Sequence, residues 1–523
     1  MLTFRLTPYA STDWSWTGTA YVTADRTSQI SPFPHPMTEQ FAVSDGKRTL
    51  LAVRERTAGH ARIRADVRTV APAHYNQTRV TAAAWPADYV LIETQPGHPV
   101  IVAAGAARTT PLYLAAVGGT LHGSWDMADL RGFATGLSAR EAARLLIYQP
   151  RYGAETLFTG IRRLTERATA TFGGALHLHY PEPALHATPR DLAPGADVLT
   201  ALTATIDAAL DLRPLDPQNT VFHLTGGFDS GIIATRAACR WPGQITTAAL
   251  QIIGAGRPQQ HRRRAQILAS LPFSGTDLTV DCADAPPLHP HCPRVSGDLI
   301  SPYEEPLFLP FTRLTALASQ HGARALVTGL GGDEMVSLSP GESSIVAAAN
   351  THITDRLPWL GLDARQALPY TDDEIAPPAV VNAITLLSVE TTAPPLLRKG
   401  IWPVHPFTHP AIIRLGEQLP LAWREFKNLQ RRQFASLGLS HDVCNPVERE
   451  SFVWLVEHSL KTYGTSLLHQ MLADGSPLID TGLVDPDGLK TAITDIGQQP
   501  WDEEFHAKLL QVIDLHLAAT AYL

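Results

Sequence analysis

The sequence predicts a two-domain α/β protein, in which a β-rich N-terminal domain precedes a doubly wound parallel sheet with a mostly helical C-terminal part. Short apolar runs punctuated by Gly, Pro and Asn fill the first 180 residues, as expected for strands. After a proline-dense stretch, strand and helix patterns alternate, which is typical of a parallel sheet covered by helices. Beyond about residue 355 the pattern is mostly helical.

The N-terminal domain is expected to span residues 1–182 and the second domain residues 195–523. Four prolines between 181 and 194 cannot continue a helix or a central strand, so the boundary is placed there. In the first domain, the apolar runs 89–92 and 100–104 are predicted strands. Ser138 followed by Glu141 is a capping-box pattern, which predicts the main helix of this region over 139–148.

In the second domain the apolar periodicity changes repeatedly between helix and strand. The predicted elements are helices at 198–210, 231–240, 261–271 and 307–321, and strands at 221–224, 245–253, 277–280 and 325–328. Such strand–helix units build a doubly wound sheet, which binds ligands at the carboxyl ends of its strands.

Composition excludes several classes of function. The chain of 523 residues is 44% hydrophobic and carries a formal net charge of −8, so no electrostatic attraction to nucleic acid or to an anionic membrane is expected. No apolar run reaches the roughly 20 residues that a membrane span needs. The four cysteines form no C-x-x-C pair, which fits a protein of the reducing cytoplasm.

The first candidate site is the segment 224–230, where a predicted strand runs into a predicted helix. Backbone N–H groups at a helix start are unpaired, and the helix dipole favours an anion there. Glycines allow close approach of a phosphate, hydroxyls add donors, and an aspartate is placed to hold Mg²⁺. The predicted phosphate-binding residues are Leu224, Thr225, Gly226, Gly227, Asp229 and Ser230. Alone, the segment also fits a tight turn that merely caps a helix.

A second glycine-rich loop, at 327–334, again follows a predicted strand and contains Asp333 and Glu334. Both loops therefore fall at the edge of the sheet where ligands bind. The pair favours a nucleotide-phosphate site over two unrelated turns.

The two loops resemble those of the asparagine synthetase family of ATP pyrophosphatases, which read Ser-Gly-Gly-x-Asp-Ser and Ser-Gly-x-Gly-x-Asp-Glu. Thr225 and Thr328 replace the two serines and keep the hydroxyl group. The resemblance implies ATP as cofactor, cleaved to AMP and pyrophosphate, with Mg²⁺ held by Asp229 and Asp333. Further nucleotide contacts are implied at Leu250, Gly329 and Arg431.

The resemblance extends to the N-terminal domain, and it implies an Ntn-hydrolase-like αββα sandwich joined to an ATP-pyrophosphatase domain. Residues 107–113 are similar to the family's Arg-x-x-Pro-Leu-Tyr turn, and 157–164 to its closing segment. The glutaminase nucleophile, a cysteine at position two, is replaced by Leu2. An alkyl chain cannot attack an amide, so glutamine is not the expected source of the amine.

Two branches of the family without glutaminase activity are β-lactam synthetases and lasso peptide cyclases. Glu390 matches the catalytic glutamate of the β-lactam synthetases, while the tyrosine that partners it there is replaced by Leu330. Leucine cannot relay a proton, and an apolar pocket suits a larger, partly apolar acyl donor such as a peptide.

Lys427 matches the family lysine expected to stabilise the oxyanion and the leaving group, and Arg431 is placed to assist it. The alternative for both is a solvated cationic helix face. The run 261–264, His-Arg-Arg-Arg, is a candidate for contact with phosphate or an acidic leader peptide, but a charge run at helical spacing favours a wet, solvent-exposed surface.

Together these features predict an ATP- and Mg²⁺-dependent lasso peptide cyclase, with Glu390 and Lys427 as catalytic residues. The expected partners are a precursor peptide, a leader-peptide-binding protein and a leader peptidase. The alternatives are a β-lactam synthetase or other small-molecule amide ligase, and a degenerate synthetase that serves as a peptide-binding scaffold.

Overall fold

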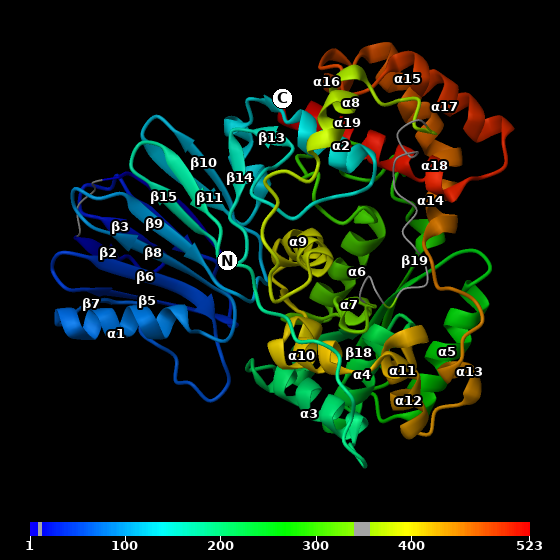
Figure 1. Cartoon of the computed structure of the whole chain (residues 1–523), viewed down its shortest axis with the longest axis horizontal. Coiled ribbons are helices and arrows are strands. Elements are labelled where there is room, and N and C mark those ends of the chain that lie inside the picture. The colour runs from blue at the N-terminus through cyan, green and yellow to red at the C-terminus, as the bar shows by residue number, and fades with distance from the viewer. Residues whose placement is uncertain (9–12, 339–341, 343–355) are drawn as a thin grey trace.

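The computed structural model of the chain describes residues 1–8, 13–338, 342 and 356–523. Figure 1 shows a β-sandwich built from the N-terminal part of the chain, coloured blue to cyan, beside a larger lobe of helices around a second sheet. Among the described residues, no helix is both long and apolar enough to cross a membrane.

The N-terminal lobe contains two seven-stranded sheets packed face to face. The first has the order β14 (Ile161–Arg163), β10 (Tyr113–Val117), β11 (Thr120–Ser124), β1 (Leu2–Leu6), β4 (Gln29–Pro32), β3 (Tyr21–Thr23), β2 (Trp14–Trp16). The second has the order β16 (Leu176–His179), β15 (Thr169–Phe172), β9 (Val100–Ala104), β8 (Tyr89–Thr94), β6 (Thr49–Glu55), β5 (Thr38–Ser44), β7 (Val67–Thr69). The predicted strands at 89–92 and 100–104 are confirmed as β8 and β9.

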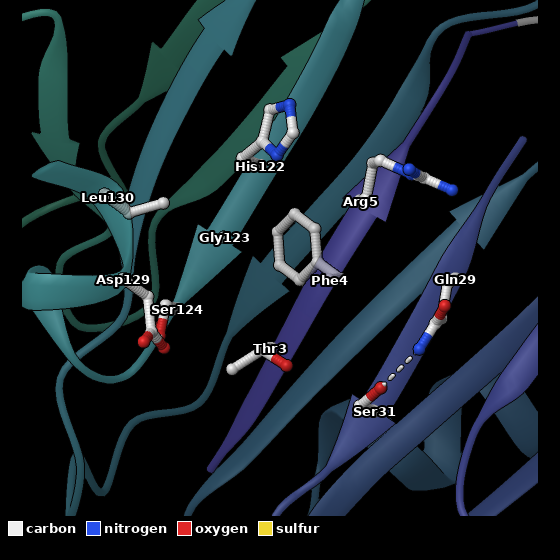
Figure 2. A pocket seen from close by; sticks show the side chains of 10 residues that line it. All are labelled: Thr3, Phe4, Arg5, Gln29, Ser31, His122, Gly123, Ser124, Asp129 and Leu130. Carbon is white, nitrogen blue, oxygen red and sulfur yellow. Dashed lines mark hydrogen bonds between the residues drawn. The ribbon is translucent and has the colours of Figure 1, made fainter. Parts of the chain in front are cut away.

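The two outer faces of the sandwich differ. Helix α1 (Pro72–Ala83) covers the second sheet, where its Tyr75 packs in a cluster with Phe41 and Leu91. The outer face of the first sheet is polar: Arg5 pairs in register with Gln29 and His122 (Figure 2). On this side only the short helix η1 (Met127–Phe133) packs beside β10 and β11 among the described residues. The sandwich thus has one long flanking helix.

The second lobe is built on a five-stranded sheet of the order β19 (Asp277–Asp281), β18 (Thr246–Gln251), β17 (Thr220–His223), β20 (Ala325–Val327), β21 (Trp402–Val404). All neighbouring strands are parallel. After β17 the chain adds β18 and β19 on one side of that strand, and then crosses over to add β20 on its other side. The topological switch point, where such sheets bind ligands, therefore lies between β17 and β20.

Helices cover both faces of this sheet. Val221 of β17 packs in the cluster that contains α6 (Phe308–Gln320), while Phe222 packs in the cluster that contains α4 (Phe228–Arg240). Successive residues of a strand point to opposite faces, so the two clusters flank the sheet. The predicted helices are confirmed as α3 (Val198–Asp211), α4, α5 (Arg257–Ser270) and α6.

Helix α2 (Ala139–Leu146) confirms the predicted helix after Ser138. Ser138 caps it as expected, with Oγ accepting from the Glu141 N–H at 3.2 Å. Helix α2 packs against α8 (Leu362–Ala367) and α19 (Lys508–Tyr522) of the second lobe, in a cluster that also includes Tyr113 and Ile161 of the first sheet. The capping box determines where a helix begins, but its apolar face determines what it packs against. The main helix on the sandwich is α1.

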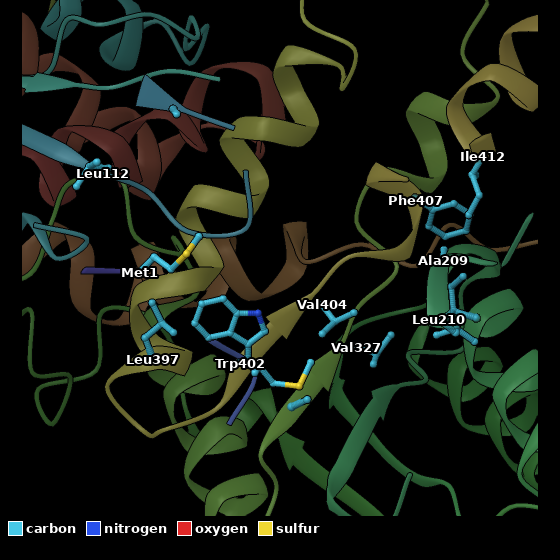
Figure 3. Packing of buried hydrophobic residues seen from close by; sticks show 14 of the residues in the cluster. Met1, Leu112, Ala209, Leu210, Val327, Leu397, Trp402, Val404, Phe407 and Ile412 are labelled. Carbon is cyan, nitrogen blue, oxygen red and sulfur yellow. The ribbon is translucent and has the colours of Figure 1, made fainter. Parts of the chain in front are cut away.

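The two lobes share one hydrophobic core. A single cluster of buried residues runs from Met1 and Leu112 to Leu397 and Trp402 (Figure 3). A buried ion pair also joins the lobes, since Arg213 donates to both oxygens of Glu55 at 2.9 and 2.7 Å. The lobes therefore form one packed body.

Candidate active site

The two glycine-rich loops follow adjacent strands, β17 and β20, at the switch point of the sheet. The first loop leads into α4, whose N-terminal turn is not capped by any side chain. The first N–H groups of α4 therefore point towards the loop, at the positive end of the helix dipole. This geometry fits the anion site that the segment 224–230 predicts.

Within the first loop, Thr225 and Ser230 hold the turn together. Their hydroxyl oxygens lie 3.0 Å apart, and Thr225 Oγ1 also accepts from the Gly227 N–H at 3.2 Å. Gly226 has a φ of +100°, a left-handed conformation that only glycine adopts without strain. The hydroxyls thus shape the loop, which leaves the backbone open towards the sheet edge.

The second loop touches the first. A Cβ added to Gly329 would lie 2.3 Å from the backbone nitrogen of Ser230, and one added to Gly332 would lie 2.5 Å from Cβ of Asp229. Only glycine permits this approach at either position. Gly329, a predicted nucleotide contact, and Gly332, which was not singled out, therefore bring the two loops together.

Lys427 links the two loops. Its Nζ lies 2.8 Å from Asp229 Oδ2 and 2.5 Å from Asp333 Oδ1. Burial by itself would lower the pKa of Lys427, but the two carboxylates outweigh burial and raise it. The ammonium is therefore held charged at the edge where an anion binds, as the resemblance implies.

Asp229 and Asp333 fit a Mg²⁺ ion. Burial raises the pKa of Asp229 to about 6 against the opposing charge of Lys427, and Asp333 adds to the rise. Asp229 Oδ1 is buried without a hydrogen-bond partner among the described residues, so it is available to a metal. No group of three or more His, Cys, Asp or Glu side chains in the described chain could hold a metal. Mg²⁺ needs only one or two carboxylates when phosphates and water complete its shell.

Arg431 supports the turn that presents Lys427. Phe426 and Lys427 have φ values of +51° and +56°, which are strained for non-glycine residues. Arg431 Nε donates to the carbonyl of Phe426 at 2.7 Å, and its guanidinium lies 5.2 Å from the ring centroid of Phe228 in the first loop. The solvated-face alternative therefore does not describe this residue.

Arg263 and Arg264 correct the prediction of a wet surface at 261–264. Both are buried, at 3% and 4% exposure. Arg264 donates to the carbonyl of Leu224 at 2.6 Å, and Arg263 pairs with Glu450 at 2.8 Å. Two residues of the site were thus missed. The helical spacing from Arg263 and Arg264 to the buried Ile267 is the signal that indicates an inward face.

Glu450 was also missed by the sequence analysis. Its Oε1 would lie 3.0 Å from a Cβ on Gly226, so the carboxylate rests against the first glycine loop. Burial raises its pKa, which the charges of Arg263 and Arg264 oppose. Nothing in the local sequence at 450 indicates this position, because α5 and the loop that carries Glu450 meet only in the folded chain.

Leu250 lies near the carboxyl end of β18, beside β17, and its carbonyl accepts from Gln260 Nε2 at 3.1 Å. The residue is therefore at the correct sheet edge for a nucleotide contact. Leu2 is fully buried within the sandwich core. Position two thus offers neither a nucleophile nor an exposed side chain.

Glu390 lies on α9 (Ala383–Leu397) and is held by the N-terminal lobe. It accepts a hydrogen bond from Tyr113 Oη, and Arg163 Nε lies 2.9 Å and 2.8 Å from its two oxygens. Tyr113 lies in the 107–113 turn and Arg163 in the 157–164 segment that the resemblance singled out. Glu390 is therefore part of a fixed network between the lobes.

The wall of one cavity contains both Glu390 and Leu330. This cavity has a volume of about 590 Å³ and is lined by α9, the 302–306 turn and the chain after α2, including Tyr148. One part of the cavity wall belongs to the second glycine loop, because the wall residue Leu330 directly follows Gly329.

A comparison with family models agrees with this geometry. Residues 201–374 match the family model described as asparagine synthase, to which the ATP-pyrophosphatase fold of the five-stranded sheet belongs. The match includes both glycine loops and ends before Glu390 and Lys427. No curated protein matches the chain significantly. Residues 201–374 are therefore an asparagine synthase-type, ATP-dependent ligase domain.

Proposed function

We propose that the protein is an ATP-dependent lasso peptide cyclase. A side-chain carboxylate oxygen of an Asp or Glu in the peptide attacks the α-phosphorus of ATP, and pyrophosphate leaves. The peptide's own N-terminal amine then attacks the acyl carbon, AMP leaves, and the amine gives up a proton as the isopeptide bond forms. Holding both ends of one peptide supplies the effective concentration for ring closure.

The observation that carries the proposal is the size and lining of the substrate space. The cavity beside Leu330 shares Tyr148, Glu305, Pro306 and Gln511 with a second cavity of about 450 Å³. Two adjacent cavities with a shared wall suit a peptide better than a single small amino acid. The apolar side chain of Leu330 at its inner end supports the same choice.

In this proposal each site residue has a stated task. The first loop and α4 bind the phosphates, and Lys427 stabilises charge on the leaving groups. Asp229 and Asp333 would hold Mg²⁺, which neutralises phosphate charge when bound. Glu390 orients the substrate as part of its network with Tyr113 and Arg163. A leader-peptide-binding protein and a leader peptidase complete the proposed pathway.

The test uses exchange of labelled pyrophosphate into ATP together with mass spectrometry. Short peptides with a free N-terminus and one internal acidic residue are incubated with protein, ATP and Mg²⁺. Exchange and the loss of one water from the peptide are expected. An N-acetylated twin of each peptide should support exchange without losing water, because its amine is blocked. Loss of water from a small amino acid instead would establish the β-lactam synthetase-like alternative.

Absence of exchange with every acyl donor would leave only the scaffold alternative. In that case Asp229→Asn would bind peptide as the wild type does.

A further inference from the structure

Four carboxylates lie in the wall of the cavity beside Leu330, and the chain neutralises three of them. The pairs are Glu390 with Arg163 at 2.8 Å, Glu304 with Arg398 at 2.8 Å, and Asp514 with Arg294 at 3.3 Å. The fourth, Glu305, forms no ion pair with any residue that the structure describes. This contrast separates Glu305 from the three paired carboxylates around it.

Glu305 is nevertheless held in place by the chain. Its N–H donates to the carbonyl of Thr391 on α9 at 3.0 Å, and its Oε1 accepts from the Leu307 N–H at 3.2 Å. One backbone bond satisfies only part of what a carboxylate can accept. A carboxylate withdrawn from water without a contact ion pair is costly, and burial raises the pKa of Glu305 against the opposing Leu307 N–H bond and the charge of Arg294. Its remaining hydrogen-bonding capacity is therefore open to a cationic ligand.

The position of Glu305 is at the junction of the two cavities, since it lines both. Tyr148 lines both as well and is 60% exposed. The backbone of Tyr148 has a φ of +58°, so the chain keeps a strained conformation at this point of the wall. A carboxylate next to an exposed aromatic ring is a favourable setting for an alkylammonium group, because the ring face also attracts a cation.

We propose that Glu305 binds a primary ammonium group of the substrate at the junction of the two cavities, with Tyr148 beside it. The role of that group as the attacking amine rests on the proposed function: the ammonium first gives one proton to Glu305 to become the nucleophile, and loses a second proton as the amide forms. The cavity places Glu305 together with Glu390 and Leu330 in one wall, so an amine held there shares the chamber that leads to the phosphate edge. The substrate class is thereby specified as a compound with a free amine on an apolar body.

Binding is tested on the full chain without ATP. Benzylammonium chloride is the probe, benzyl alcohol is its neutral counterpart, and both are titrated by calorimetry. The wild type should prefer the ammonium by about tenfold, the ratio expected from one hydrogen bond to a charged group. Glu305→Gln, which keeps the size of the side chain, should lose that preference.

The matched control is Glu503→Gln, because Glu503 is an exposed glutamate that lines only the second cavity. It removes the same charge and should keep the preference. The assignment is overturned if the wild type does not discriminate, if Glu305→Gln still discriminates, or if Glu503→Gln loses the preference equally. Thermal melting of each variant without ligand verifies that it is folded.

A second measurement connects the site to the reaction. With an active peptide, Glu305→Gln should keep pyrophosphate exchange at saturating peptide within about twofold of the wild type, while its KM for the peptide rises by about tenfold. Hydroxylamine, a neutral nucleophile, should trap the activated acyl group equally well in both proteins. No exchange in the wild type would refute the proposed function and leave the ammonium preference standing. Exchange and amide formation both unchanged in Glu305→Gln would refute the role of Glu305.

Discussion

The ammonium of Lys427 lies 2.8 Å from the carboxylate of Asp229, although 198 residues separate them in the chain. The contact joins a strained turn before α12 (Asn428–Ser436) to the first glycine loop. Because Asp333 of the second loop touches the same ammonium, one cation sets the spacing of both loops. The mechanism of the site therefore depends on Lys427 as strongly as on the loops themselves.

Lys427→Ala is expected to lower the rate of pyrophosphate exchange by about 10²–10³-fold, the typical loss for one preorganised charge donor. The reason is that no other described side chain places an ammonium between the two loop carboxylates. Lys490→Ala removes a lysine from an exposed ion pair with Asp487 and should leave the rate unchanged. Exchange within twofold of the wild type in Lys427→Ala would show that this lysine is not catalytic.

Asp229→Asn is expected to raise the Mg²⁺ concentration for half-maximal exchange by at least about tenfold, since the variant has one carboxylate fewer for the ion. Magnesium titrations of both proteins at saturating ATP measure the shift. Asp487→Asn is the matched control, because Asp487 lies far out on the surface. Equal magnesium dependence of wild type and Asp229→Asn would remove Asp229 from the metal site.

Gly329→Ala should abolish exchange while most of the fold survives. The new methyl group would meet the backbone nitrogen of Ser230 at 2.3 Å and would push the loops apart, at a cost of about 1–3 kcal/mol of stability. Gly132→Ala is the control, because no atom lies within 4 Å of its added Cβ. An active Gly329→Ala protein would mean that contact between the loops is dispensable.

Glu55→Gln should destabilise the protein by about 3–5 kcal/mol, because it leaves the buried guanidinium of Arg213 without its charge partner. The indole N–H of Trp402 also donates to Glu55 at 2.7 Å, so the junction of the lobes loses a second contact. Urea denaturation measures the change. Glu93→Gln, which breaks a surface pair with Arg79, should cost about 0–1 kcal/mol. Similar losses in both variants would contradict a special role for the buried pair.

Stability should fall as the pH drops below about 6.5, the ordinary pKa of histidine. Burial lowers the pKa of His405 to about 3 and that of His35 to about 4, so both stay neutral in the fold and bind a proton on unfolding. The contribution of these two histidines to the free energy of unfolding is complete above about pH 6.5. Each histidine loses about 1.4 kcal/mol of it per pH unit as the pH falls from about 6.5 to its pKa in the fold.

Urea denaturation between pH 7 and pH 5 measures how steeply the free energy of unfolding changes with pH. His35→Gln removes one titrating group and should reduce this slope by about 1.4 kcal/mol per pH unit. His441→Gln, at an exposed position, should not change it. A wild-type free energy of unfolding that stays constant over this range would contradict the prediction.

Elements formed by neighbouring residues could be predicted well. Each strand–helix unit between 198 and 328 follows the apolar period of its own segment, and the structure confirms these units as α3–α6 and β17–β20. The prediction for α2 was right about its cap at Ser138, but the local pattern did not indicate which elements the helix would pack against. A cap is a contact over three residues, whereas the packing partners α8 and α19 lie more than 200 residues away.

The arginines of α5 illustrate the same limit within the site. A run of cationic residues indicates a solvated face because exposed charges cost least. Arg263 and Arg264 are buried instead, because Glu450, Asp277 and backbone carbonyls from distant segments accept their hydrogen bonds. Their interpretation depended on partners that no local pattern contains.

The sequence by itself determined the alternation of strand and helix, the two glycine loops with their aspartates, and the leucine at position two. Each is a property of a few consecutive residues, where glycine geometry, hydroxyl donors and apolar period act locally. Only the tertiary structure decided that Lys427 lies between the two aspartates, that Arg163 and Tyr113 hold Glu390, and that Glu305 is the one carboxylate of its cavity wall without an ion pair to a described residue. These side-chain contacts form only when chain segments that are far apart in the sequence pack together and exclude water. Whether a charged side chain finds a partner is decided by that packing.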